Sequence, residues 1–287
     1  MDPFEERDRL LNEPLTNKPI LTEEPASLRD KKHVSEYLSD MTCHIFSSSV
    51  KFRSDELRRL QEMGDLASIQ FDSQNQSHVA ELKKLANIVF PEKQLENVLD
   101  DPEWKKLGFQ NSKPESDFRG GGFLSLIALQ NFCKNRRQVV TEILNWSESQ
   151  PPFLFACVVI SAAFKLKHFF HFGLLEHYIK KHDEPHTCSR DALKVFLCLM
   201  GSLQDQFLTL VEHYTLKTFE YWKSETQKNP QLTIIDFKTC EERIDHLFKK
   251  QFEIAAVSRD KGDIELFLQE WDAFVISERI IPFQSIH

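Results

Sequence analysis

The sequence predicts an all-α fold, and three observations lead to this prediction. Apolar residues recur at intervals of three and four through most of the chain, which is the spacing of one face of an α-helix. Residue types that cap helices precede several of these apolar runs. The chain has no Val- and Thr-rich alternating run typical of a half-buried strand, and no repeat at a fixed period. We therefore expect a single multi-helix domain.

Composition and charge exclude several classes of protein. The 287 residues are 41% hydrophobic and 28% charged, so most of the chain can form a buried core. A formal net charge of −8 argues against a protein that binds nucleic acid through phosphate contacts. The most apolar run, residues 153–164, is shorter than the roughly 18–20 residues of a membrane-spanning helix. The six cysteines form no Cys-x-x-Cys pair and follow no apolar signal peptide, so we expect reduced thiols in a cytoplasmic protein.

The first 35 residues differ in composition from the rest of the chain. Four prolines stand among many charged residues with little apolar periodicity, which predicts a partly disordered lead-in over residues 1–35. Ordered structure is expected after this lead-in, with Ser54 placed to cap a helix that has Leu57 and Leu60 on one face. We therefore expect an N-terminal helical extension over residues 36–76.

Two further elements are expected before residue 100. Ser77 precedes one apolar stripe at helical spacing, which consists of Val79, Leu82, Leu85, Ala86 and Val89. Pro91 is placed to open a turn, because its fixed φ suits the first position of a turn or helix. The residues that this turn is expected to direct inward are Leu95, Val98 and Leu99.

The run Asp101-Pro102-Glu103 is typical of a helix start. A capping Asp, a Pro at the first helical position and an acid near the positive end of the helix each favour it. Gly108 is placed to end this short helix, because glycine readily adopts the left-handed conformation of a C-terminal cap.

The remaining chain is expected to contain a loop followed by helices. The loop carries Pro114 and three consecutive glycines. Ser189 and Asp236 are the expected caps of two of the helices beyond it. The expected helical blocks are residues 123–132, 139–146, 153–180, 189–225, 236–256 and 263–279. Residues 123–132 are apolar on most sides, as in a central helix.

The glycines gather in one segment of the chain. Four of the eight lie between Gly108 and Gly122, around the sequence Asp117-Phe118-Arg119. A charged loop tip followed by three glycines lets another surface approach the backbone closely. Arg119 is therefore the strongest candidate for a functional residue.

A purely structural interpretation of the same segment stays open. Asp117 and Arg119 can pair with each other, or Arg119 can cap nearby carbonyl groups. Trp104 and Phe109 are expected to anchor the loop in the core rather than to contact a partner. The residues expected to bond or stiffen the loop are Gln110 and Pro114.

Other familiar sites have little support. The chain has no P-loop, no dinucleotide-binding fingerprint and no Gly-x-Ser-x-Gly elbow. His182, His186 and Cys188 lie close together, but a proline interrupts any helix that would aim both histidines in the same direction. His168 and His171 share a helix face with Phe residues, which favours half-buried histidines over metal ligands. We therefore expect no bound metal.

The glycine-bearing segment resembles the signature of the ELMO domain, W-x3-G-F-Q-x3-P-x-[TS]-D-[FL]-R-G-x-G-x3-L-x2-L-x2-F. The residues that match it at the same spacing are Trp104, Gly108, Phe109, Gln110, Pro114, Asp117, Phe118, Arg119, Gly120, Gly122, Leu126, Leu129 and Phe132. Ser116 stands where Thr is commoner and keeps the hydroxyl group. The resemblance implies an ELMO domain over residues 77–235, with helices of residues 236–287 packed on it.

Two branches carry this domain, and the resemblance implies a different role for each. The short ELMOD proteins are GTPase-activating proteins for Arf-family and Arf-like small GTPases, and the signature arginine is essential to that activity. The larger engulfment-and-motility scaffolds use the domain beside a PH domain and a Pro-rich tail to partner Rac exchange factors. This chain is short, has no PxxP segment and retains the arginine, so it looks like the ELMOD branch.

The ELMOD resemblance implies a role for each site residue. Arg119 is implied as an arginine finger, Asp117 as the residue that orients it, and Gly120 and Gly122 as residues that let the backbone approach the nucleotide. The residues implied to shape the loop or bind the partner are Phe118, Gln110 and Ser116. GTP and Mg²⁺ belong to the partner GTPase, so we expect no cofactor in this chain.

The alternative is a non-catalytic helical adaptor that binds a small GTPase or its exchange factor through the same segment. The expected partner is an Arf or Arf-like GTPase in its GTP-bound state, and nucleic acid is not expected. We expect a cytoplasmic location, and peripheral association with endomembranes stays open.

Overall fold

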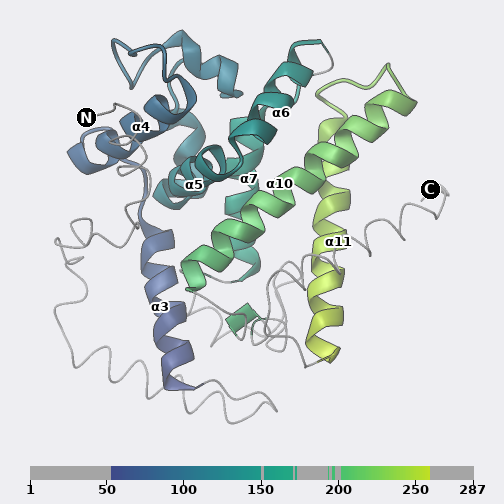
Figure 1. Cartoon of the computed structure of the whole chain (residues 1–287). Helices are drawn as coiled ribbons and strands as arrows, with labels where there is room; N and C mark the ends of the chain where they lie inside the picture. Colours follow the sequence, from purple (N-terminus) through teal and green to yellow (C-terminus); the bar gives the residue numbers. More distant parts are fainter. Residues whose placement is uncertain are drawn as a thin grey trace, which may run out of the picture. The chain divides into compact units, whose positions relative to one another are not determined.

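The computed structural model describes residues 53–149, 152–170, 172, 193, 196–197 and 202–258. Among these residues every regular element is a helix and no strand is present (Figure 1), so the all-α prediction is confirmed. The elements are α3 (Ser54–Ser68), α4 (Gln76–Val89), the 3₁₀ helix η2 (Pro102–Leu107), α5 (Glu115–Asn135), α6 (Arg137–Ser149), α7 (Phe155–Phe169), α10 (Leu203–Lys228) and α11 (Phe237–Ser258). The expected lead-in over residues 1–35 and the expected helix over 263–279 lie outside the described residues.

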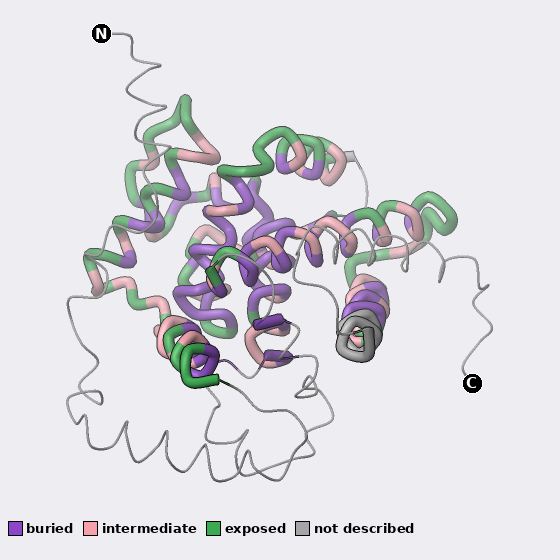
Figure 2. Tube along the Cα trace, turned by 60° about the horizontal axis from the view of Figure 1, so that its bottom comes forward, coloured by how far each residue is buried: buried purple, intermediate pink, exposed green. Residues whose placement is uncertain are grey.

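The core forms around α5 and α7, which pack against each other. α4 and α3 cover α5 on one side, while α10 runs diagonally across α7 and is followed by α11 (Figure 1). Small buried residues on α7, Ala162 and Ala163, leave room for the neighbouring backbone to approach. Figure 2 shows the buried residues along α5, α7 and the inner face of α10, with exposed residues on the outer helices. The central helix expected over residues 123–132 is therefore confirmed.

The predicted cap of the first helix is wrong by one residue, and the second helix begins just before Ser77. Arg53 is the N-cap of α3, and its backbone N–H donates to Glu56 Oε2 at 2.7 Å, so Ser54 already lies in the helix. Asn75 caps α4, because its Oδ1 accepts the backbone N–H of Ser77 at 3.0 Å. At α3 the Glu56 carboxylate accepts the N–H of the cap residue, whereas at α4 the side chain of Asn75 accepts an N–H of the first turn.

The short helix after residue 100 agrees with the prediction. Asp101 Oδ1 accepts the backbone N–H of Glu103 at 2.9 Å, and Pro102 occupies the first position of η2. Gly108 ends η2 in the left-handed conformation with φ 94°. Its freedom is needed there, since a Cβ at Gly108 would lie 2.4 Å from the backbone nitrogen of Phe155. Upstream, of the three residues expected to turn inward, Val98 is buried and Leu95 and Leu99 are half-buried.

The later helices differ from prediction mainly at their starts. α6 and α7 lie where residues 139–146 and the first part of 153–180 were expected. The block 189–225 is not one helix, because Ser202 has extended backbone and caps α10 through its hydroxyl. Asp236 directly precedes α11, and its carboxylate accepts the backbone N–H of Thr233 at 2.8 Å.

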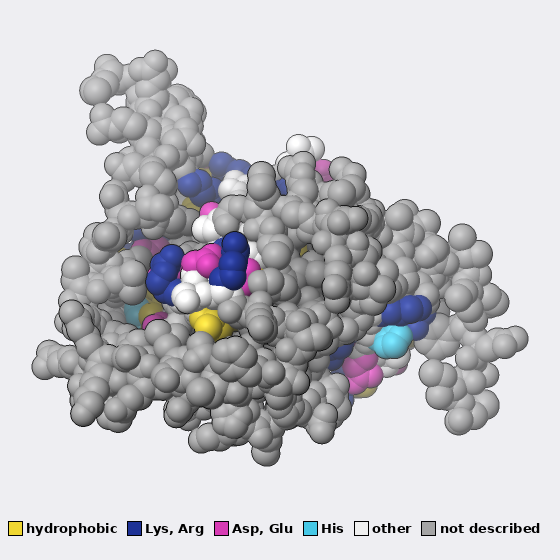
Figure 3. All heavy atoms as spheres, turned by 90° about the horizontal axis from the view of Figure 1, so that it is seen from below, with side chains coloured by type: hydrophobic (Ala, Val, Ile, Leu, Met, Phe, Trp, Pro, Cys, Tyr) yellow, Lys and Arg dark blue, Asp and Glu magenta, His cyan; other side chains and the backbone are white. Residues whose placement is uncertain are grey.

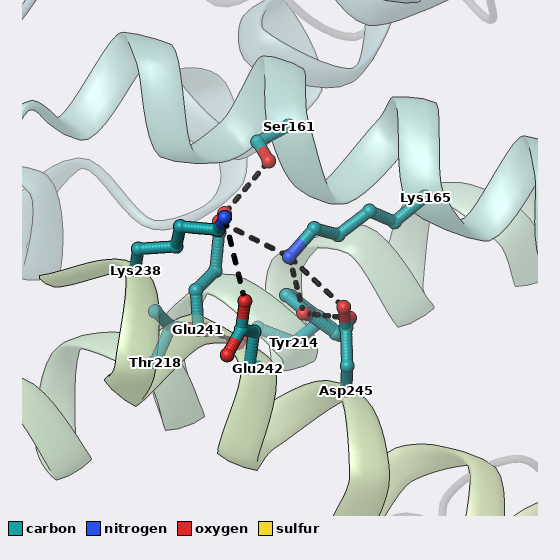
Figure 4. A network of polar contacts seen from close by, with 8 residues as sticks. All are labelled: Ser161, Lys165, Tyr214, Thr218, Lys238, Glu241, Glu242 and Asp245. Carbon is teal, nitrogen blue, oxygen red and sulfur yellow. Dashed lines mark hydrogen bonds and ion pairs between the residues drawn. The ribbon is translucent and has the colours of Figure 1, made fainter.

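A polar cluster joins α7, α10 and α11 (Figure 4). Lys165 Nζ on α7 lies 3.1 Å from Glu241 Oε2 and 3.0 Å from Asp245 Oδ2, both on α11. Ser161 donates to Glu241, and Tyr214 on α10 donates to Asp245. Burial and the negative charge of Asp245 raise the pKa of Tyr214, which keeps its hydroxyl protonated as a donor. The cluster thus sets the position of α11 against α7.

The surface carries charges of both signs. Figure 3 shows Lys and Arg side chains next to Asp and Glu side chains on the face seen from below. Some of these charges form ion pairs within one helix, such as Arg58 Nη1 and Glu62 Oε1, which lie 2.6 Å apart on α3. No helix in the described ranges is long and apolar enough to cross a bilayer.

Candidate functional site

Arg119 lies in a helical segment and not, as expected, at the tip of a loop. The first part of α5 runs from Glu115 to the kink at Gly122. It forms because the carbonyl of Pro114 accepts the backbone N–H groups of Asp117 and Phe118, at 2.9 and 3.3 Å. We call residues 115–121 the arginine segment. Its helical backbone fixes where the Cα of Arg119 lies.

The arginine segment rests on a continuous row of aromatic rings, each in contact with the next. The members of this aromatic row, in order, are Phe90, Trp104, Phe109, Phe118, Phe71, His78 and Phe123. Phe118 is fully buried between Phe109 and Phe71, with ring centroids 5.6 and 5.2 Å away. Trp104 is also fully buried and donates Nε1–H to the carbonyl of Val98 at 2.9 Å. The expectation that Trp104 and Phe109 are core anchors is confirmed.

Two of the three consecutive glycines are required by the packing of this chain. Gly122 has φ 65° and ψ −160°, and a Cβ there would lie 2.5 Å from the carbonyl oxygen of Ile69. A Cβ at Gly121 would lie 2.6 Å from the side chain of Ser125. Both glycines are buried, so they do not present backbone to an outside surface. Only Gly120 is exposed.

The guanidinium of Arg119 is held by a single hydrogen bond to its own helix. Arg119 is exposed, and its Nε donates to the carbonyl of Ser116 at 2.9 Å. Within the described part of the chain it forms no ion pair. Of the two structural interpretations of the sequence, the structure therefore has the cap of a local carbonyl and not the pair with Asp117.

Asp117 turns inward and links three parts of the chain. Its Oδ2 accepts the backbone N–H of Gln110 at 3.0 Å and lies 3.9 Å from Cys157 Sγ on α7. Burial raises the pKa of Asp117, while the bond from Gln110 and the charge of Arg119 act in the opposite direction. Burial and the charge of Asp117 also raise the pKa of Cys157 to about 12, so this thiol stays protonated. Asp117 thus connects the arginine segment to Gln110 and to α7.

The other predicted loop residues hold the start of the arginine segment. The hydroxyl of Ser116 donates to the carbonyl of Lys113 at 2.9 Å and accepts from Asn111 Nδ2 at 3.0 Å. Pro114 is buried at the N-cap of α5. Gln110 donates its backbone N–H to Asp117 Oδ2, and the residue is exposed to solvent. These contacts shape the turn that leads into α5.

The structure adds two residues to the site that the sequence did not single out. Cys157 contacts Asp117, and Phe164 lies beside Gly120, where an added Cβ would be 3.7 Å from Phe164 Cδ2. Both belong to the apolar run at residues 153–164, whose pattern predicts only a core helix. Phe164 nevertheless has 39% of its surface exposed. No feature of that pattern marks either residue.

Of the two histidine clusters, only His168 lies in the part of the chain that the structure describes. His171, His182, His186 and Cys188 lie outside the described residues. The ring of His168 packs edge-on against Phe164, with centroids 4.3 Å apart. In the ranges that the structure describes, no group of three or more His, Cys, Asp or Glu side chains could hold a metal ion.

Comparisons with known proteins place the arginine segment in a recognised domain. The family model described as the ELMO/CED-12 family matches residues 61–241, which include the whole aromatic row and both ends of the segment. ELMO domain-containing protein 2 of Homo sapiens is 40% identical over 77 residues, or 27% of this chain and 26% of its own length. ELMO domain-containing protein B of Dictyostelium discoideum is 29% identical over 198 residues, or 69% of this chain and 58% of its own. No solved structure matches the chain.

This chain covers only part of its relatives: 26% of protein 2, 58% of protein B and 21% of ELMO domain-containing protein C of Dictyostelium discoideum. The family model, however, extends over more than half of the chain and matches it on both sides of the kink in α5. The match includes the residues whose positions the structure explains: a buried Trp104, an inward Asp117 and a Gly122 with positive φ. On this evidence the chain belongs to the ELMO/CED-12 family.

Proposed function

We propose that this protein activates a small GTPase of the Arf or Arf-like class by supplying Arg119 to the nucleotide site of that GTPase. The observation that carries the proposal is an exposed arginine on a helical segment anchored in the core, without an ion pair to any described residue. Arg136 differs in this respect, because it pairs with Glu212 Oε2 at 3.2 Å. Membership of the ELMO/CED-12 family supports a role connected with GTPases.

The helical segment that carries Arg119 favours catalysis because it is already ordered before a partner binds. On one side Phe118 is fixed in the aromatic row, and on the other the kink at Gly122 ties α5 to Ile69. A side chain that enters a partner from a fixed Cα loses less conformational freedom on binding than one from a flexible loop. The arginine segment is therefore suited to present one side chain at a defined position.

The chemistry requires a positive charge at the transferring phosphoryl group. Hydrolysis of GTP increases negative charge on the phosphoryl oxygens and on the leaving group in the transition state. The Nε of Arg119 is occupied by the Ser116 carbonyl, which orients the guanidinium and leaves its two terminal amino groups for phosphate oxygens. An arginine supplied in this way accelerates hydrolysis by about 10³–10⁵ in GTPases.

The other residues would act on Arg119 from a distance. Asp117 would hold the arginine segment against Gln110 and α7, and its inward carboxylate would not compete for the guanidinium. The nucleotide and Mg²⁺ would belong to the partner, so this chain would need no cofactor of its own. Association with endomembranes would follow from the location of the partner GTPase.

The test is single-turnover GTP hydrolysis by a panel of GTP-loaded Arf and Arf-like GTPases. Wild-type protein, Arg119→Lys and Arg119→Ala are compared, with circular dichroism and thermal unfolding as folding controls. We expect wild type to accelerate at least one GTPase. Arg119→Lys should lose at least about a hundredfold, since lysine lacks the planar fork of donors.

Two results would contradict the proposal. If Arg119→Lys and Arg119→Ala accelerate hydrolysis as well as wild type does, Arg119 is not the catalytic group. If wild type binds a GTP-loaded GTPase without acceleration, and Arg119→Ala binds equally, the protein is an adaptor. The second result favours the alternative function that the sequence left open.

A further inference from the structure

Gly120 has no internal reason to be glycine. Its φ lies outside the positive range in which glycine is favoured, and the nearest atom to an added Cβ is Phe164 Cδ2 at an ordinary 3.7 Å. This contrasts with Gly121 and Gly122, where a Cβ would meet neighbouring atoms at 2.6 and 2.5 Å. Glycine is among the least favourable residues inside a helix, so the fold alone would be better served by alanine at position 120.

Phe164 is the neighbour of Gly120 and is itself unusual. It is one of three large apolar residues that the described ranges leave exposed; the other two are Ile234 and Ile235. Its ring is supported edge-on by His168, one turn further along α7. Supported exposed aromatic side chains beside a bare backbone form a surface on which a partner can pack closely.

We infer that Gly120 and Phe164 form the contact surface for the partner GTPase, directly beside Arg119. This inference rests on the proposed function. The occupant is the GTP-loaded small GTPase, which would place an apolar side chain next to its nucleotide site against the ring of Phe164. The surface is continuous with Arg119, because Gly120 is the next residue in the same helix.

The two residues would have separate roles in binding. The missing side chain at Gly120 lets the partner approach the helix backbone, which shortens the distance that Arg119 must span. The ring of Phe164 provides apolar area that is removed from water only in the complex. Arg119 would act on the rate at saturation, whereas Gly120 and Phe164 would act on affinity.

The test uses the full chain and the GTPase that wild type recognises. Dissociation constants are measured with that GTPase loaded with a non-hydrolysable GTP analogue, and half-saturating concentrations are measured in single-turnover hydrolysis. We expect Phe164→Ser and Gly120→Leu each to raise both values by about tenfold or more. The maximal rate should fall far less than it does in Arg119→Lys.

Gly120→Ala separates a binding role from a structural one. We expect it to raise the melting temperature by about 2–4 °C and yet to weaken binding, because alanine favours the helix while its methyl group occupies the contact surface. Two matched controls carry the same chemistry elsewhere on the surface: Ile235→Ser for Phe164→Ser, and Asn145→Leu for Gly120→Leu. Both controls should bind as wild type does.

Three outcomes would overturn the inference. Unchanged dissociation constants in Gly120→Leu and Phe164→Ser, with wild-type acceleration intact, would refute the contact surface and leave the proposed function standing. If affinity falls only in those variants and controls whose melting temperature also falls, the effect on binding is structural. If wild type neither binds nor accelerates any GTPase of the panel, both the proposed function and the contact surface fail.

Discussion

The backbone N–H of Phe123 donates a 2.9 Å hydrogen bond to the carbonyl oxygen of Ile69, which is the C-cap residue of α3. This bond replaces the intrahelical partner that Phe123 lacks at the kink in α5. It follows that the direction of the arginine segment is set by the C-cap residue of α3, which lies three elements before α5 in the chain.

Substitution of Gly122 by alanine should destabilise the protein strongly. The residue needs positive φ, and a Cβ would lie 2.5 Å from Ile69 O, so the bond between Ile69 and Phe123 would be displaced. We expect a loss of at least about 2 kcal/mol in the free energy of unfolding, measured with urea. Gly120→Ala is the matched control, since it makes the same change two residues away without strain. Equal stability of the two variants would contradict this account of the kink.

Removal of the Asp117 carboxylate should loosen the arginine segment while the positive charge of Arg119 is kept. In Asp117→Ala the Gln110 N–H and the Cys157 thiol both lose their acceptor. We expect a loss of about 1–2 kcal/mol in the free energy of unfolding. The acceleration of GTP hydrolysis should fall less than in Arg119→Ala. An Asp117 variant with full stability but no acceleration would instead point to a direct catalytic role for this carboxylate.

His78 should make the protein less stable in mild acid. Burial lowers its pKa in the folded state, against a weaker opposing effect of Asp72, and its Nδ1 accepts the backbone N–H of Asp72 at 3.0 Å. The unfolded chain therefore takes up the proton more readily, so this stabilisation is complete above pH about 6.5 and is lost as the pH falls through the folded-state pKa. Protonation would also remove the acceptor.

The measurement for His78 is urea unfolding of wild type and His78→Gln at pH 7.5 and 5.5. We expect wild type to lose more stability between the two pH values than the variant does, by at most about 1.4 kcal/mol per pH unit. Since the remaining histidines are common to both proteins, their titration cancels in the comparison. A pH dependence that is the same in both proteins would contradict the prediction.

Lys165 should be needed for the attachment of α11. Lys165→Met leaves Glu241 and Asp245 close together without a cation, and both carboxylates are largely shielded from solvent. We expect a loss of about 1–3 kcal/mol and faster amide hydrogen exchange along α11. The matched control is Lys238→Met, which breaks an exposed pair with Glu242 and should change stability by less than about 0.5 kcal/mol. Equal effects of the two variants would mean that the polar cluster does not hold α11.

Local sequence features predicted the fold class and several helix boundaries correctly. Asp101 and Gly108 mark the two ends of η2 as expected, because capping depends on residues within one turn of each other. The apolar periodicity predicted the buried positions Leu82 and Leu85 on α4. It did not predict that α4 also buries His78 and Glu81, because Asp72 and Gln130, which donate hydrogen bonds to these two side chains, lie outside α4.

By itself, the sequence determined the helical class, the aromatic anchors and the ELMO signature that contains Arg119, all of which depend on residue type and spacing. Tertiary structure alone decided that Asp117 faces inward, that Gly122 is required by Ile69, and that Phe164 is exposed beside Gly120. The physical reason is the separation in sequence over which each effect acts. Periodicity and capping act between residues a few positions apart, whereas the direction of a side chain and the space at a glycine depend on helices that are distant in sequence.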